Sequence, residues 1–130
     1  MDEDNRNNFR LIVGGVWPIE AVEDLPEVWL ADWRVYEIVQ STAEPAMRHL
    51  VGWAMRAGQG QVSSAIRYID PVTRRCVTRS GRTYHLHGKP GLSEDARYVW
   101  GVWKRLNRVD DARDVTDELA SLFEAASRQR

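Results

Sequence analysis

The sequence predicts a protein of the α+β class, in which two C-terminal helices pack on a curved antiparallel sheet. Between residues 47 and 88, short runs of β-branched and aromatic residues alternate with turn-forming residues, as in a meander or a small barrel. After residue 92, apolar residues recur at three- and four-residue spacings, which is typical of amphipathic helices. The chain has 130 residues, the size of one domain. We expect the acidic residues 1–8 to be disordered and residues 9–130 to form that domain.

The first 45 residues carry weaker structural signals. Phe9–Trp17 is apolar and rich in β-forming residues, which predicts a first strand. A short helix is expected to start at Pro18, because proline suits the first helical position, and Pro26 limits its length. Trp33–Gln40 has the β-branched and aromatic composition of a second strand.

Four further strands are predicted in the middle of the chain. They cover residues 47–55, 62–70, 75–79 and 82–88. A glycine-rich turn and a turn that starts with Asp70-Pro71 separate the first three of these strands. The last two strands form a hairpin, with Ser80-Gly81 as a two-residue loop.

The two-residue loop predicts the register of this hairpin, because cross-strand partners then flank the loop symmetrically. It pairs Cys76 with His85 and Arg74 with His87. Residues two apart in a strand point to the same side, so Cys76, His85 and His87 are expected together on one face. The opposite face then holds Val77, Tyr84 and Leu86.

Two helices are predicted at the C-terminal end. Ser93 is the expected N-cap of the first helix, and Glu94 and Asp95 follow in the first turn, where the helix dipole favours acids. Its apolar stripe consists of Ala96, Val99, Trp100, Val102, Trp103, Leu106 and Val109. The second helix is expected to begin near Asp114 or Thr116. Its stripe consists of Val115, Leu119, Leu122, Phe123 and Ala126.

The formal net charge is −1, but the charges are unevenly distributed. Residues 46–108 contain twelve basic and three acidic side chains, whereas residues 1–45 contain ten acidic and three basic ones. Residues 109–130 are also acidic. Either the acidic ends fold against the basic middle and neutralise it, or the middle forms a patch for an anionic partner.

Composition excludes several classes of protein. The single cysteine, Cys76, cannot form an intrachain disulfide. No apolar run approaches the roughly 18 residues of a membrane span, and the polar N-terminus is unlike a signal peptide. We therefore expect a cytoplasmic protein with no membrane partner. The 16 arginines against 2 lysines indicate a GC-rich bacterial genome.

No residue pattern predicts catalysis or a bound cofactor. The acids lie mostly near the ends of the chain, and no pair has a spacing that would support acid–base chemistry. An alternative is a metal site made by His85, His87 and Cys76. Against it, the neighbouring Arg74 disfavours a cation, and no carboxylate is placed to support the histidines. We predict a non-enzymatic protein that holds neither a cofactor nor a metal.

Basic side chains make up the main predicted recognition surface, because arginine binds anionic groups through paired hydrogen bonds. If the hairpin and the first helix adjoin, one surface results, made by Arg74, Arg75, Arg79, Arg82, Lys89, Arg97, Lys104, Arg105 and Arg108. A separate apolar partner surface is predicted at Trp29, Leu30 and Trp33, because the stretch LPEVWLADW does not fit one periodic face.

Three short motifs resemble those of uncharacterised small proteins encoded by bacterial genomes and their mobile elements. They are Val62-Ser63-Ser64, Thr78-x-Ser80-Gly81-Arg82-x-Tyr84 and Gly88-x-Pro90-Gly91, within residues 48–108. The resemblance implies a small accessory protein of phage or plasmid origin, and it assigns no activity and no functional residue. Proteins of that kind often bind a host or defence component, as anti-CRISPR inhibitors do.

The sequence therefore predicts a non-enzymatic protein-binding module, in its finer form an inhibitor of a bacterial defence system. Small size, excess tryptophan, polarised charge and the lack of a catalytic pattern support this prediction. The alternative is a nucleic-acid-binding protein that uses the arginine-rich hairpin and the basic helix face.

Overall fold

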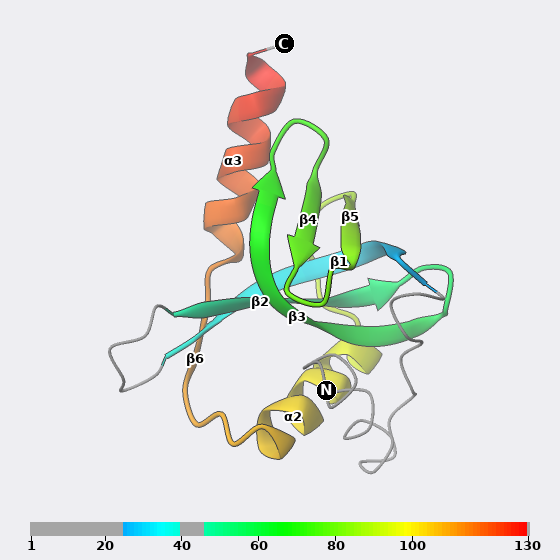
Figure 1. The fold of residues 1–130 in the computed structure, drawn as a ribbon, viewed down its shortest axis with the longest axis vertical. Coiled ribbons are helices and arrows are strands. Elements are labelled where there is room, and N and C mark those ends of the chain that lie inside the picture. The colour runs from blue at the N-terminus through cyan, green and yellow to red at the C-terminus, as the bar shows by residue number, and fades with distance from the viewer. Residues whose placement is uncertain (1–24, 40–45, 130) are drawn as a thin grey trace.

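A computed structural model describes residues 25–39 and 46–129 as a curved sheet with two helices (Figure 1). The elements, in chain order, are β1 (Glu27–Ile38), β2 (Met47–Ala54), β3 (Gln59–Asp70), β4 (Arg75–Thr78), β5 (Thr83–His87), α2 (Glu94–Leu106), β6 (Ala112–Asp114) and α3 (Thr116–Arg128). The α+β prediction is confirmed. The predictions for residues 1–8, for Phe9–Trp17 and for a helix at Pro18 concern residues outside this part of the chain.

The first five strands close into a barrel. The strand order is β2-β3-β4-β5-β1-β6, and β1 also pairs with β2, so that β1 to β5 form a ring. Every neighbouring pair is antiparallel except β5 and β1, which run parallel. Closure removes the unpaired edges that an open sheet would expose. The short strand β6 then adds to the second half of β1.

A β-bulge in β1 decides which of its side chains face the barrel interior. The pairing of β1 with β2 shifts between Ala31 and Arg34, and Asp32 has a left-handed backbone (φ 47°). The extra residue changes the alternation, so both Leu30 and Trp33 point inward and are 0% exposed. The prediction that Trp29, Leu30 and Trp33 share an exposed patch is therefore wrong for two of the three. Only Trp29 lies at the surface.

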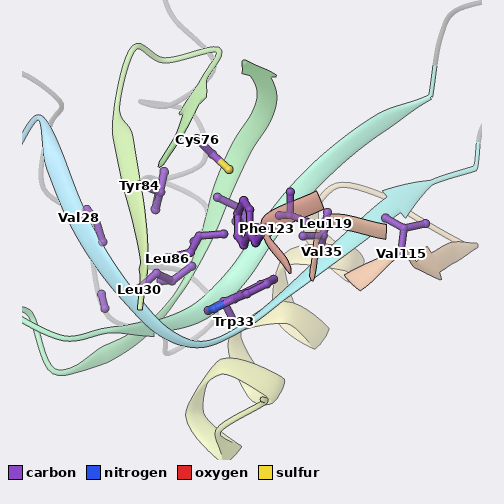
Figure 2. Packing of buried hydrophobic residues seen from close by; sticks show 12 residues of the cluster. Val28, Leu30, Trp33, Val35, Cys76, Tyr84, Leu86, Val115, Leu119 and Phe123 are labelled. Atoms are coloured by element: carbon purple, nitrogen blue, oxygen red, sulfur yellow. The ribbon is translucent and has the colours of Figure 1, made fainter. Parts of the chain in front are cut away.

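The main core fills the barrel, and α3 closes one end of it. Figure 2 shows Leu119 and Phe123 of α3 reaching toward Trp33 and Leu86 of the barrel. The rings of Phe123 and Trp33 meet edge to face, with centroids 5.7 Å apart. Val115, Leu119 and Phe123 of the predicted stripe are buried, whereas Leu122 is exposed, so the stripe is narrower than predicted.

A second core lies between α2 and the outer side of the sheet. Its apolar residues include Val51 of β2, Val62 of β3 and the predicted α2 stripe from Ala96 to Trp103. Ser93 caps the helix as predicted, because its hydroxyl accepts a hydrogen bond from the backbone N–H of Ala96 at 3.1 Å. The helix thus covers β2 and the first half of β3 from outside (Figure 1).

The predicted register of the β4–β5 hairpin is wrong by one residue. Cys76 pairs with Tyr84, and Arg75 pairs with His85. The loop contains three residues, because the backbone N–H of Thr78 donates to the carbonyl of Arg82, and Gly81 adopts the left-handed region (φ 96°) that ends such loops. The shift moves Cys76 into the barrel interior, where its side chain is fully buried.

Neither helix in the described ranges has the length and the apolar content that crossing a membrane would require.

Candidate recognition surface

One region on the outside of the barrel has no covering helix in the described part of the chain. α2 packs on β2 and β3, and α3 packs against β1 at the end of the barrel. The outward side chains of β4, β5 and the first half of β1 are exposed or half-buried. Together with the end of β3, all of them except Ala31 and His87 form what we call the recognition face. Its members are Glu27, Trp29, Tyr68, Asp70, Arg75, Val77, Thr83 and His85.

The strand register arranges these side chains in two rows across four strands. In one row, Asp70 pairs with Arg75, Arg75 with His85, and His85 with Trp29. The other row consists of Tyr68, Val77, Thr83 and Glu27. Direct cross-strand partners point to the same side of a sheet. The eight side chains therefore form one continuous surface rather than scattered exposed positions.

Trp29 is an exposed aromatic side chain that its neighbours hold in place. Its ring stacks on that of His85, with centroids 4.3 Å apart and planes 9° from parallel. The Nε2 atom of His85 lies 2.7 Å from Oε1 of Glu27, which orients the imidazole. Trp29 nevertheless keeps 43% of its surface exposed. A rigid, half-exposed tryptophan loses little conformational entropy when a partner covers it.

The rest of the face combines one further aromatic ring with charges of both signs. Tyr68 is 60% exposed at the opposite end of the rows from Trp29. Asp70 and Arg75 lie 3.7 Å apart as an ion pair. A hydrogen bond from the side chain of Thr73, with further bonds from the backbone amides of Thr73 and Val72, lowers the pKa of Asp70. The carboxylate therefore stays ionised and offsets the charge of Arg75.

Two of the predicted recognition arginines have structural roles. Arg82 is 0% exposed, and its Nε atom donates to the carbonyl of Leu25 at 2.9 Å. Arg74 is half-buried, with its guanidinium 5.1 Å above the ring of Phe123 and a hydrogen bond from Nη2 to the carbonyl of Gly88. Arginine is seldom buried, so both were predicted at the surface. That prediction is wrong for Arg82, whereas Arg74 keeps part of its surface exposed.

The remaining predicted basic residues do not form one surface. Arg75, Arg79 and Lys89 lie in or beside the hairpin, whereas Arg97, Lys104, Arg105 and Arg108 belong to α2 or follow it directly. Figure 1 places α2 at one side of the barrel and the strands β4 and β5 at the other. The hairpin and α2 therefore do not adjoin. On α2, the Nζ atom of Lys104 lies 5.4 Å from the centroid of the Trp100 ring, and its charge is engaged there.

The alternative metal site is not assembled. His85 and His87 point outward from β5, but Cys76 points into the barrel on the other side of the sheet. Burial raises the pKa of the Cys76 thiol to about 12, which disfavours the thiolate that binds metals. Within residues 25–39 and 46–129, no three His, Cys, Asp or Glu side chains are grouped so as to hold a metal ion.

Neither Tyr68 as a surface residue of the site nor the contact between Trp29 and His85 was predicted from the sequence. That contact depends on the parallel pairing of β1 and β5, whose partners are 56 residues apart, Trp29 with His85. Local patterns carry no signal for such a pairing. Alternation could have identified Glu27 and Trp29 as outward residues, had the strand been predicted to begin before Trp33.

Comparison with protein families, with curated proteins and with solved structures yields no match to this chain. The recognition face is therefore assigned from geometry and chemistry alone.

Proposed function

We propose that this protein is a non-enzymatic protein-binding module that contacts its partner through the recognition face. The observation that carries the proposal is the stacked, half-exposed Trp29 at one end of a continuous surface that no described helix covers. Tryptophan, tyrosine and arginine dominate the binding energy of protein interfaces, and Trp29, Tyr68 and Arg75 supply all three. Their arrangement on a closed barrel keeps the surface rigid before binding.

The charge of the face favours a protein partner over a polyanion. Glu27 and Asp70 are both on it. Asp70 lies beside Arg75, which would otherwise attract a phosphate, and Glu27 lies beside His85. A nucleic-acid backbone would bring further negative charge close to both carboxylates, at an electrostatic cost. A protein surface can instead present complementary charges of both signs.

A second candidate, single-stranded nucleic acid, is favoured by one specific observation. Two exposed aromatic rings, those of Trp29 and Tyr68, lie on the outside of a small barrel, and the exposed Arg67 and Arg79 lie nearby in β3 and the hairpin loop. Bases stack on such rings regardless of sequence, and arginines hold the backbone. Binding of this kind would weaken steeply as salt is added.

We propose that the protein acts in the bacterial cytoplasm and that a mobile element encodes it. We further propose that it inhibits a defence complex. The support for these proposals is the motif resemblance. The motif residues Thr78 to Tyr84 span the β4–β5 turn, and Tyr84 at their end is buried in the barrel. The single cysteine, Cys76, is buried as a free thiol, which suits a reducing compartment.

The proposal is tested by comparative affinity capture from bacterial lysate at moderate salt. We expect the wild-type chain to retain a specific protein, and Trp29→Ser and Arg75→Glu each to lose most of it. Leu122→Ser is the matched control, because Leu122 is a similarly exposed apolar residue on α3, 49% exposed. Circular dichroism establishes that each variant is folded. Equal retention by all four proteins would contradict the assignment, as would a captured partner that nuclease treatment removes.

A further inference from the structure

A pocket of about 410 Å³ lies at the end of the barrel that α3 closes, and its lining includes none of the eight residues of the recognition face. Its walls come from α3, from the turn between β3 and β4 and from the connection between β5 and α2. Most of the lining is apolar: Trp33, Pro71, Val72, Pro90, Ala120 and Phe123. Sites for small ligands have this size range and this apolar character, with few polar groups.

The polar groups of the pocket are dominated by two cations. The guanidinium of Arg74 is fixed over Phe123 and bonded to the carbonyl of Gly88, and its Nε atom is buried without a hydrogen-bond partner in the described part of the chain. Lys89 lies exposed at the rim. Among residues 25–39 and 46–129, no carboxylate forms an ion pair with Arg74 or Lys89. The pocket therefore combines an apolar body with two cations that form no ion pair in the described part of the chain.

One acid also lines the pocket, and it limits the charge of the ligand. Glu124 of α3 is paired with Arg128, with Oε1 3.0 Å from Nη1. Its charge is partly neutralised by that pair, but a doubly charged phosphate close to it would still be repelled. A carboxylate has a single charge and two acceptor oxygens, which suit one guanidinium assisted by one lysine.

We infer that this pocket binds an apolar group that ends in a carboxylate. The apolar part contacts Phe123, Val72 and the two prolines, and the carboxylate accepts hydrogen bonds from Arg74 and Lys89 at the mouth. Two sources can supply this chemistry: a free carboxylic acid, or the C-terminus of a peptide with an apolar last residue. The site does not depend on the recognition face, so it stands or fails independently of the function proposed above.

The probes are N-acetyl-L-phenylalanine and its neutral amide, titrated into the full chain and followed by two-dimensional ¹H–¹⁵N NMR. The reporter is the indole N–H of Trp33, which donates to the carbonyl of Gly88 at 3.2 Å in the pocket wall. We expect the acid to shift this signal and to bind about tenfold more tightly than the amide, as a charge-assisted bond would give. A short peptide that ends in phenylalanine, as acid and as amide, then distinguishes the two sources.

Variants identify the groups that hold the carboxylate. Arg74→Gln should weaken binding of the acid by at least about tenfold, and the exposed Lys89→Gln by about threefold. Lys104→Gln is the matched control, because it removes the same charge from α2, and it should leave affinity unchanged. Ser127→Trp places a bulky side chain on the α3 wall and should abolish binding. It keeps the inference testable if Arg74→Gln is unfolded.

Either of two results would overturn the inference. One is equal affinity of the acid and the amide, which would show that the cations do not contact the ligand. The other is the absence of any shift of the Trp33 signal at millimolar concentrations of both the amino acid and the peptide. Trp29→Ser should bind the probes normally, so loss of the proposed protein partner and loss of this ligand are separate outcomes.

Discussion

Arg82 is buried, and its side chain has a structural role. The residue is 0% exposed, and its Nε atom holds the backbone at Leu25. Replacing Arg82 by alanine leaves a cavity and removes the hydrogen bond to Leu25 in one step, which we expect to cost roughly 2–4 kcal/mol of unfolding free energy. Arg79→Ala, in the same loop but exposed, should change stability by no more than about 0.5 kcal/mol. Urea unfolding of both variants checks the difference, and similar losses from the two would contradict the burial of Arg82.

The buried thiol of Cys76 makes the fold less stable as the pH becomes alkaline. Burial raises the pKa of its thiol to about 12, from an ordinary value of 9.0 in the unfolded chain. The folded protein therefore keeps the proton at a pH where the unfolded chain releases it. The unfolded state then binds fewer protons than the folded state. The contribution of the thiol to the free energy of unfolding is therefore fully present below about pH 8 and is lost as the pH rises toward 12.

The size of this effect should be on the order of 1 kcal/mol between pH 8 and 10, measured by urea unfolding. Cys76→Ala removes the titrating group, so the variant should lose stability less steeply over the same range, whatever its stability at neutral pH. The native thiol should also resist alkylation at pH 8 and react once the chain is unfolded. Parallel pH profiles for the two proteins would show that the thiol is not buried.

At the scale of elements, the contact between β3 and α2 depends on a glycine. A Cβ atom added at Gly60 would lie 2.6 Å from the Cα of Ala96, too close for the two elements to keep their separation. We expect Gly60→Ala to destabilise the fold by about 2 kcal/mol or more, since backbone rather than a flexible side chain must move. Gly101→Ala, in the middle of α2, has room and should instead stabilise by roughly 0.5–1 kcal/mol.

Thermal unfolding of these two alanine variants should therefore shift the midpoint in opposite directions from wild type. The pair is informative because each change adds one methyl group, which meets backbone atoms of α2 at Gly60 but has room at Gly101 within a helix. A stabilised Gly60→Ala protein would show that α2 does not approach β3 as closely as the structure has it.

The helices and the middle strands were predictable because their signals are local. The stripe from Ala96 to Trp103 and the cap at Ser93 each depend on residues within a few positions of one another. The hairpin loop was predicted one residue too short, because Gly81 fits either a two-residue loop or the last position of a three-residue one. That single residue moved Cys76 to the opposite face.

The parts that local patterns missed depend on contacts between distant segments. Closure of the barrel requires β1 to pair in parallel with β5, and β6 is a strand only because it lies along β1. The same closure brings His85 under Trp29, so the strongest feature of the recognition face was not predictable locally. Trp29 itself was predicted at the surface. Leu30 points inward by alternation with it, and the bulge at Asp32 turns Trp33 inward as well.

At the scale of the whole molecule, the uneven charge of the sequence is divided between opposite sides of the fold. The basic residues of α2 lie away from the β4–β5 hairpin, and Arg48 of β2 forms ion pairs with Glu37 and Glu118. In the described residues, part of the basic middle is thus neutralised by acids from β1 and α3. This distribution supports the proposal of a protein partner, whose surface can carry charges of both signs, over a long polyanion.

This distribution predicts how partner binding responds to salt. On the recognition face the carboxylate of Asp70 balances the charge of Arg75, and Glu27 adds a further negative charge, so few counterions are released when a protein covers it. We expect the affinity for the captured partner to change by less than about threefold between about 50 and 200 mM salt. A nucleic acid held by six or more phosphate contacts would lose about a thousandfold over the same range. Isothermal titration calorimetry at several salt concentrations distinguishes the two. A steep linear fall of the logarithm of affinity with the logarithm of salt concentration would favour a nucleic acid as the partner instead of a protein.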